Sequence, residues 1–415
     1  SDAAMTASDN PADETRPQSS GQQMAVIGLI SAGHFISHFY VLCLAPLYIA
    51  MSNDLGVGFA ELGLISSGFF VASATLQMPA GLLVDRIGAK RVLFVGMFVL
   101  SGSITLAGLT DSYWALLVLF MVAGAGNCVF HPCDYVILSS SIGEDKLGRA
   151  FSVHSFSGSA GFFAVPLIMP FLEGWSDWRT ALFISGICGL VIAGVILLLQ
   201  GVLVDTASRK KKEPGQLRRT KDALLSRRIL SHFVYFITSS AATSALAGLT
   251  IVVLVAHYGV SNSLAGYILL AYLVAASVGV IAGGIIADKT KRHDLVLILT
   301  MLIAAVVTAL AATGILTFWL CVVMLVIAGI TKGVVAPSRD LMVRNDAPPG
   351  LLGGVVAFVT IGFTIGNGAA PAIAGWLVDI GSPLNVFWFA AATSLAAIGC
   401  VLVARQDAPG PVGQK

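Results

Sequence analysis

The stretch Gly81-Leu-Leu-Val-Asp85-Arg86-Ile-Gly88-Ala-Lys90-Arg91 is a short, polar and basic segment between two long apolar runs. The chain repeats it as Gly284-Ile-Ile-Ala-Asp288-Lys289-Thr-Lys291-Arg292, so that Gly284 follows Gly81 by 203 residues. Both copies read glycine, three apolar residues, aspartate and a cation, with further cations behind. A polar loop that recurs between apolar runs indicates a chain built from two related halves.

The composition is typical of a membrane protein. Charged residues make up 11% of the 415 residues and hydrophobic ones 56%, against about 25% and 45–50% in soluble domains. Apolar runs of about 18 residues or more recur along the chain, and each can cross the hydrocarbon core of a bilayer as a helix. Because the backbone finds no water to bond in lipid, such runs must be helical. We therefore expect an all-α integral membrane protein rather than a large soluble core.

The apolar runs form two sets of six. The first set is expected at 24–50, 60–84, 91–110, 114–140, 148–172 and 179–204, and the second at 229–257, 262–287, 294–313, 316–341, 352–378 and 384–405. These sets predict a first bundle over 24–204 and a second over 229–405. A basic linker over 205–228 joins them, a disordered polar segment over 1–23 precedes them, and a tail over 406–415 follows.

The repeat continues beyond the loop. Gly63 and Gly266 also match at an offset of 203, and from the fourth helix onward the offset is 205. The later pairs are Pro132 with Pro337, Gly161 with Gly366 and Pro166 with Pro371. Two parallel repeats of this kind predict two bundles related by an axis along the membrane normal, with a solute site between them.

The doubled loop resembles the loop signature of the major facilitator superfamily, over about Met24 to Arg405. The resemblance implies twelve transmembrane helices in two pseudo-symmetric six-helix bundles, with helices 1, 4, 7 and 10 lining the cavity. It also implies a monomer in the bacterial inner membrane that needs no cofactor. The conformational residues that it implies in and beside the loops are Gly81, Asp85, Arg86, Gly88, Arg91, Arg149, Gly284 and Asp288.

The distribution of cations predicts the orientation. If the repeated loops are cytoplasmic, Arg179 is the only one of 24 Lys and Arg residues in an outward loop, and both termini are then cytoplasmic. All six tryptophans fall at the outward helix ends, as in an aromatic belt. The linker cations of Arg209-Lys-Lys-Lys212 could contact anionic lipid headgroups. The net charge of +2 gives no indication of nucleic-acid binding.

Polar residues inside the predicted helices are the candidate site residues, because charges in hydrocarbon are costly and usually face a cavity or a partner. In helix 4, Asn127, His131 and Asp134 share one helical face. In helix 10, the repeat places Lys332 opposite Asn127 and Arg339 opposite Asp134. We expect Asp134 and Arg339 to form an inner gate. The alternative for Lys332 is a cation that extends to the membrane surface, although it starts several turns from either helix end.

Histidines are concentrated in the first half. His34 and His38 are four residues apart on helix 1, and His154 lies near the start of helix 5. A single buried histidine is usually no more than a hydrogen-bonding partner of a carbonyl. A pair on one face can instead take up and release a proton near neutral pH. We expect His34, His38, His131 and Asp134 to carry proton coupling.

A second resemblance is more local. Phe130-His131-Pro132 in helix 4, Gly33-His-Phe-Ile-Ser-His-Phe39 in helix 1 and Leu147-Gly-Arg149-Ala-Phe151 at the start of helix 5 resemble the fosmidomycin-resistance group. That group exports small drugs in exchange for protons. Helix 4 lacks the arginine of typical drug/proton antiporters, and helix 5 lacks their Gly-Pro-x-x-Gly-Gly run, so the direction of transport stays open.

Three classes of function compete. The first is a proton-coupled secondary transporter of a small organic anion, which would bind at His34, His38, Asn127, His131, Lys332 and Arg339. The second is a carrier of a divalent metal or a metal chelate that uses His34, His38, His131 and Asp134, which are suitable ligand types. The third is a non-transporting receptor. The sequence shows neither an added soluble domain nor a long loop that would favour this class. The sequence shows neither a nucleophile with a paired base nor a phosphate-binding loop, so we expect no enzymatic activity.

Overall fold

The computed structural model describes residues 19–205, 224–348 and 351–406. Its first half comprises α1 (Ser20–Leu42), η1 (Ala45–Leu47), α2 (Tyr48–Leu55), α3 (Phe59–Ile87), α4 (Ala89–Ala107), α5 (Tyr113–Asn127), α6 (Phe130–Ser141), α7 (Glu144–Trp175), α8 (Trp178–Leu198) and η2 (Gln200–Val202). Its second half comprises α10 (Arg227–Tyr258), α11 (Asn262–Lys289), α12 (His293–Ala312), α13 (Phe318–Asp346), α14 (Leu352–Asp379) and α15 (Asn385–Gln406).

Within the described ranges the helices form 12 candidate membrane spans, which confirms the predicted all-α membrane fold. α1 begins at Ser20, four residues earlier than expected, because Ser19 and Gln22 form a capping box at its start. Residues 20–23, which belong to the segment expected to be disordered, are therefore helical. The rest of that segment up to residue 18, the tail from residue 407 and most of the basic linker, with its cations at 209–212, lie outside the described residues.

Three of the predicted helices are divided in the part of the chain that the structure describes. The span expected at 24–50 consists of α1, η1 and α2, and the span expected at 179–204 consists of α8 and η2. The span expected at 114–140 consists of α5 and α6, with a turn at residues 128 and 129. Pro132 has no N–H to donate to the carbonyl of Cys128, and its ring crowds that carbonyl. Pro337, its counterpart in the repeat, lies inside the continuous α13. A proline therefore weakens the helix at both positions, and the surrounding packing decides where the helix breaks.

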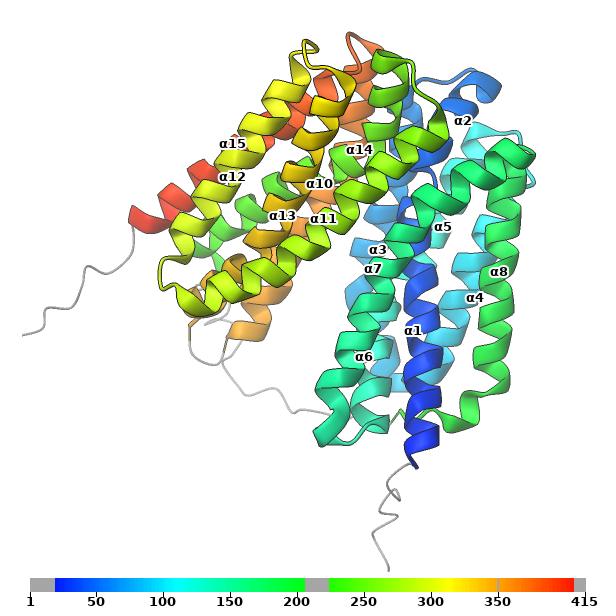
Figure 1. The fold of residues 1–415 in the computed structure, drawn as a ribbon. Coiled ribbons are helices and arrows are strands. Elements are labelled where there is room, and N and C mark those ends of the chain that lie inside the picture. The colour runs from blue at the N-terminus through cyan, green and yellow to red at the C-terminus, as the bar shows by residue number, and fades with distance from the viewer. Residues whose placement is uncertain (1–18, 206–223, 349–350, 407–415) are drawn as a thin grey trace, which may run out of the picture.

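The two halves pack closely at one end only (Figure 1). α3 contacts α14 and α7 contacts α11 across the interface. A Cβ on Gly63 of α3 would meet the backbone of Pro371 on α14, so the two helices approach at backbone distance. We call the end at Phe59 and Asp379 the closed end. The other end, where α1 begins and α15 ends, is the termini end, and toward it the halves diverge.

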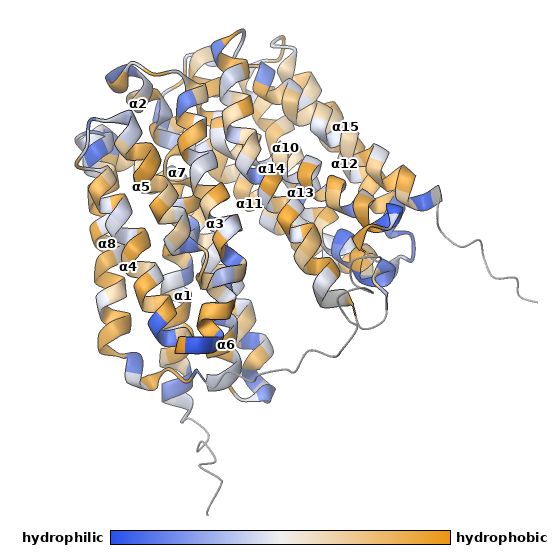
Figure 2. Ribbon diagram, turned by 180° about the vertical axis from the view of Figure 1, so that it is seen from behind, coloured by the Kyte–Doolittle hydropathy of each residue, from blue (hydrophilic) through white to orange (hydrophobic). Residues whose placement is uncertain are grey.

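Polar residues gather near the helix ends, and hydrophobic ones cover most of the helix length (Figure 2). All six tryptophans lie at or near helix ends on the closed side: Trp114, Trp175, Trp178, Trp319, Trp376 and Trp388. Arg179 lies at the same end, where its guanidinium forms ion pairs with Asp54 and Asp111. These acidic partners neutralise a cation that the sequence places alone on this side.

Candidate functional site

A cluster of histidines around one buried carboxylate occupies the first half, between α1, α6 and α7. His34 Nδ1 lies 3.4 Å and His154 Nε2 lies 3.6 Å from the same oxygen, Asp134 Oδ2. All three residues are buried, and Asp134 is only 1% exposed. The His34 ring stacks on His154 at 3.8 Å between centroids and also lies 4.3 Å from His38. His131 joins the cluster at 5.6 Å from His34.

The cluster depends on close helix packing and is short of hydrogen bonds. A Cβ on Gly158 of α7 would lie 2.8 Å from His34 Nε2, so glycine here lets α7 approach the imidazoles of α1 in the positions that they occupy. Within the described part of the chain, neither oxygen of Asp134 has a hydrogen-bond partner, nor does Nδ1 of His34 or of His154. A buried carboxylate without hydrogen bonds is costly while its neighbours are neutral, and a proton on the carboxylate or on a neighbouring imidazole lowers that cost. The arrangement can therefore hold a proton.

The same three residues are the group best placed to hold a metal ion. The candidate ligand atoms of His34, Asp134 and His154 lie within 4.8 Å of one another. A tetrahedral site needs lone pairs that converge on one point about 2.0–2.2 Å away. The rings of His34 and His154 are stacked and only 28° from parallel, so their lone pairs lie in two nearly parallel planes and converge poorly on one point. A shared metal requires one ring to rotate, and this geometry does not favour the metal alternative.

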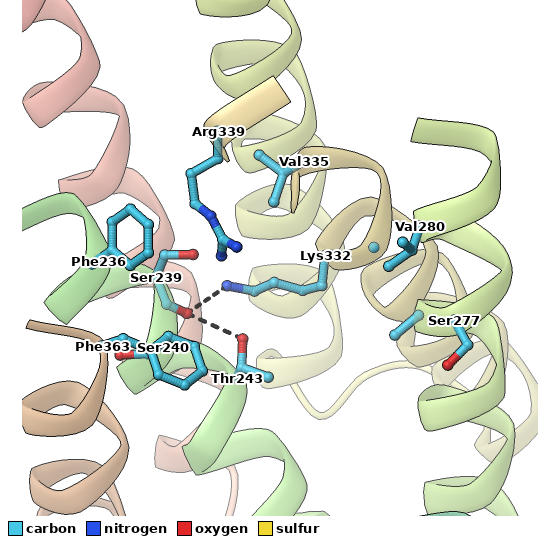
Figure 3. A pocket seen from close by; sticks show the side chains of 12 residues that line it. Phe236, Ser239, Ser240, Thr243, Ser277, Val280, Lys332, Val335, Arg339 and Phe363 are labelled. Carbon is cyan, nitrogen blue, oxygen red and sulfur yellow. Dashed lines mark hydrogen bonds between the residues drawn. The ribbon is translucent and has the colours of Figure 1, made fainter. Parts of the chain in front are cut away.

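The two cations of α13, Lys332 and Arg339, lie in a pocket of their own, inside the second half (Figure 3). The pocket has a volume of about 220 Å³. Lys332 Nζ donates a hydrogen bond to the carbonyl of Ser239 at 2.8 Å. Arg339 Nε donates to Asp340 Oδ1 at 2.8 Å, and its guanidinium stacks 4.6 Å from the centre of the Phe236 ring. We call this the cation pocket; its lining residues are Phe236, Ser239, Ser240, Thr243, Ala276, Ser277, Val280, Lys332, Gly333, Val335, Arg339 and Phe363.

A larger cavity of about 360 Å³ lies between the halves, and we call it the central cavity. His38, Asn127 and His131 line it, as expected, whereas Lys332 and Arg339 do not. The expectation that the cations face the histidines across one cavity therefore needs correction. The two spaces adjoin at α10 and α14, because Thr243 and Phe363 line both. Asn127 does not contact Lys332 and instead donates to Ser73 Oγ at 3.4 Å.

The expected gate residues are apart in this structure. Asp134 contacts histidines and Arg339 contacts Asp340, so the two do not form a pair here. The loop residues lie at the termini end, with exposed side chains for Asp85, Arg86, Arg91, Arg149 and Asp288. Gly81 and Gly284 have open space where a Cβ would lie, and Gly88 adopts a φ of 90° between α3 and α4.

Sequence reasoning missed two contacts, one in the histidine cluster and one beside the loop that follows α3. It noted His154 without placing it in the site. The short turn between α6 and α7 puts Asp134 and His154 at similar depth in neighbouring helices, but spacing along the chain does not show that their side chains face one another. It also missed Lys90, whose Nζ donates to the carbonyl of Leu203 at 2.9 Å and lies 3.8 Å from Asp205 Oδ1. This contact ties the loop after α3 to the segment that follows α8.

Comparison of the chain with models of known protein families identifies the family to which it belongs. The model described as Major Facilitator Superfamily matches residues 30–253 and 228–415. The chain belongs to the major facilitator superfamily. Among curated relatives, the fosmidomycin resistance protein of Escherichia coli (strain K12) is 24% identical over 372 residues, covering 85% of this chain and 86% of the relative. The probable galactarate/D-glucarate transporter GudP of Bacillus subtilis (strain 168) is 24% identical over 394 residues, covering 84% of each.

Solved structures share the fold of this superfamily member. A bacterial homologue of the human lysosomal transporter Spinster, in an inward-facing and unoccupied conformation, has a TM-score of 0.78 at 16% identity and covers 95% of this chain and 100% of its own. The nucleoside transporter NupG has a TM-score of 0.77 at 12% identity and covers 93% and 99%. The chain is thus a multi-pass membrane transporter of small solutes and not an enzyme, and the resemblance to the fosmidomycin-resistance group is confirmed.

Proposed function

We propose that this superfamily member moves a small organic anion across the bacterial inner membrane by alternating access, coupled to protons. The anion carries a carboxylate or a phosphonate, and it binds beside Lys332 and Arg339. His38, Asn127 and His131 contact the solute from the first half, with His34 behind them. Both termini face the cytoplasm, and the divergence of the halves toward the termini end then corresponds to an inward-facing state.

The observation that carries this proposal is the cation pocket. Lys332 and Arg339 point toward one another in Figure 3, and no carboxylate is among the described residues that line the pocket. The Lys332 ammonium has a neutral carbonyl as its partner. Arg339 forms an ion pair with Asp340, whose side chain is 63% exposed. Two neighbouring cations with so little compensation favour an anionic ligand. Relatives named for anions include a probable galactarate/D-glucarate transporter and a probable nitrate transporter.

The histidine cluster supports the proton side of the proposal. Asp134 with His34 and His154 forms a buried group whose charge depends on a bound proton, and His38 and His131 connect it to the central cavity. Protonation there can balance the charge of the anion and bias the helices around the cavity. His154 joins His34, His38, His131 and Asp134 as a proton-coupling residue. Asp134 and Arg339 act as the inner gate when the termini end closes.

Binding tests the anion site directly. Thermal shift of the purified protein is measured with fosmidomycin, D-glucarate and nitrate, the solutes for which relatives are named. Binding to the native state raises the melting temperature. For the solute that binds, Lys332→Gln should weaken the affinity roughly 10- to 100-fold, because a charge-assisted bond contributes about 1.5–3 kcal/mol. Lys332→Arg should keep part of the affinity.

The matched control is Lys146→Gln, which removes the same charge at the start of α7, where Lys146 contacts Ser20. It should bind as the unchanged protein does. Transport in proteoliposomes tests the coupling: an imposed pH gradient should drive accumulation, and Asp134→Asn should abolish that dependence. Normal binding by Lys332→Gln would overturn the anion site, and transport that ignores the pH gradient would overturn the coupling.

A further inference from the structure

We infer that the transported anion is amphipathic, with its anionic group in the cation pocket and an uncharged apolar body in the central cavity. The inference rests on the proposed function and names the class of its substrate. It follows from the arrangement of the two spaces, which adjoin but differ in chemistry. Thr243 and Phe363 line both, so one solute can extend past them from one space into the other.

The cation pocket suits a compact charged group. Its polar surface comes from Lys332, Arg339 and hydroxyl side chains on α10 and α11, and hydroxyl groups can donate to the oxygens of a carboxylate or phosphonate. Its volume of about 220 Å³ leaves little room for a large substituent beside that group. A drug-sized solute usually needs about 300–1,000 Å³, so the remainder must lie elsewhere.

The central cavity suits an uncharged body. No Asp, Glu, Lys or Arg is among the described residues that line its 360 Å³. The apolar part of its wall comes from both halves and includes three phenylalanine rings: Phe70, Phe162 and Phe363. Aromatic walls of this kind bind flat apolar groups through contact area and ring geometry. A second charged group on the solute would lose its hydration here without gaining a fixed counter-charge.

Gly248 on α10 offers a way to fill this cavity without disturbing the helices. The residue is buried and lines the central cavity, yet a Cβ placed on it would meet no atom within 4 Å. Leucine favours a helix more than glycine does, so Gly248→Leu should fold and project its side chain into the space of the solute body. Gly399→Leu is the matched control, because Gly399 is exposed on α15 and is equally free of neighbours.

The test uses two pairs of probes that share an anionic group and differ in the body. Methylphosphonate is compared with 3-phenylpropylphosphonate, and acetate with 4-phenylbutyrate, by calorimetry on the full chain in nanodiscs. In at least one pair the phenyl probe should bind roughly tenfold or more tightly, the gain expected from burying an aromatic group. Gly248→Leu should remove that gain and leave the short probe unchanged, whereas Gly399→Leu should preserve it. The pair that shows the gain identifies the anionic group.

Two other outcomes separate this inference from the proposed function. If short and long probes bind equally, and both lose affinity in Lys332→Gln, the anion site stands and the amphipathic solute is wrong. If Lys332→Gln binds every probe as the unchanged protein does, the anion site itself is wrong, and this inference falls with it.

Discussion

Asp379 should stabilise closure of the closed end, because it caps a helix of the opposite half. It is the last residue of α14, and its two carboxylate oxygens accept the backbone N–H groups of Phe59 at 2.9 Å and Ala60 at 2.7 Å. These N–H groups begin α3, whose own N-cap residue, Gly58, supplies no side-chain hydrogen bond. When the halves separate at this end, α3 loses its cap.

The expected effect of Asp379→Asn follows from the two terms that the carboxylate supplies. An N-cap side chain contributes about 0.5–2 kcal/mol, and a negative charge at a helix N-terminus adds about 0.3–1 kcal/mol at an exposed position. The amide keeps one acceptor oxygen and loses the charge. Asp379→Asn should therefore shift the equilibrium toward opening at this end by about 1 kcal/mol, or roughly fivefold, and Asp379→Ala by somewhat more.

Electron–electron distance measurements can detect this shift. Spin labels at Leu109 and Ile315 are suitable, because both are well exposed in loops at the closed end, one in each half. Asp379→Asn should increase the population of longer distances. The matched control is Asp177→Asn, since Asp177 Oδ1 caps α8 at Thr180 N within the first half. An unchanged distance distribution, or an equal change in the control, would refute the reasoning.

Three further predictions concern the gate, the loops and the packing. Asp134→Arg and Arg339→Asp should each abolish transport, and the double reversal should restore part of it; equal loss in all three variants would count against the pair. The superfamily resemblance implies that Asp85 helps to hold the halves closed at the termini end, so Asp85→Asn should leave folding intact, raise the reactivity of cysteines introduced there and lower transport. Unchanged reactivity would contradict this role. Gly283→Ala should lower the melting temperature by several degrees, because its Cβ would press on the α13 backbone, whereas Gly284→Ala should be tolerated; a calorimetric scan compares them.

The sequence by itself determined the twelve spans and the two halves. The reason is local: in a bilayer each apolar run must satisfy its own backbone hydrogen bonds, so hydrophobic length alone predicts a helix. The loop around Asp85 recurs around Asp288, and this repeat shows that the two halves are related to one another. The sequence also identified the polar residues worth examining, because charged groups in hydrocarbon are rare and costly.

Only the tertiary structure decided which of these residues meet. His154 reaches Asp134 because α7 packs on α1 and α6, with Gly158 leaving room for the imidazoles. Lys332 matches Asn127 in the repeat, yet the two residues line different spaces, since the rotation of each helix about its axis is set by the neighbours against which it packs. The tertiary structure also decided the contact of Asp379, which caps a helix more than 300 residues away along the chain. Such contacts depend on close approach between helices, and spacing within one helix cannot predict them.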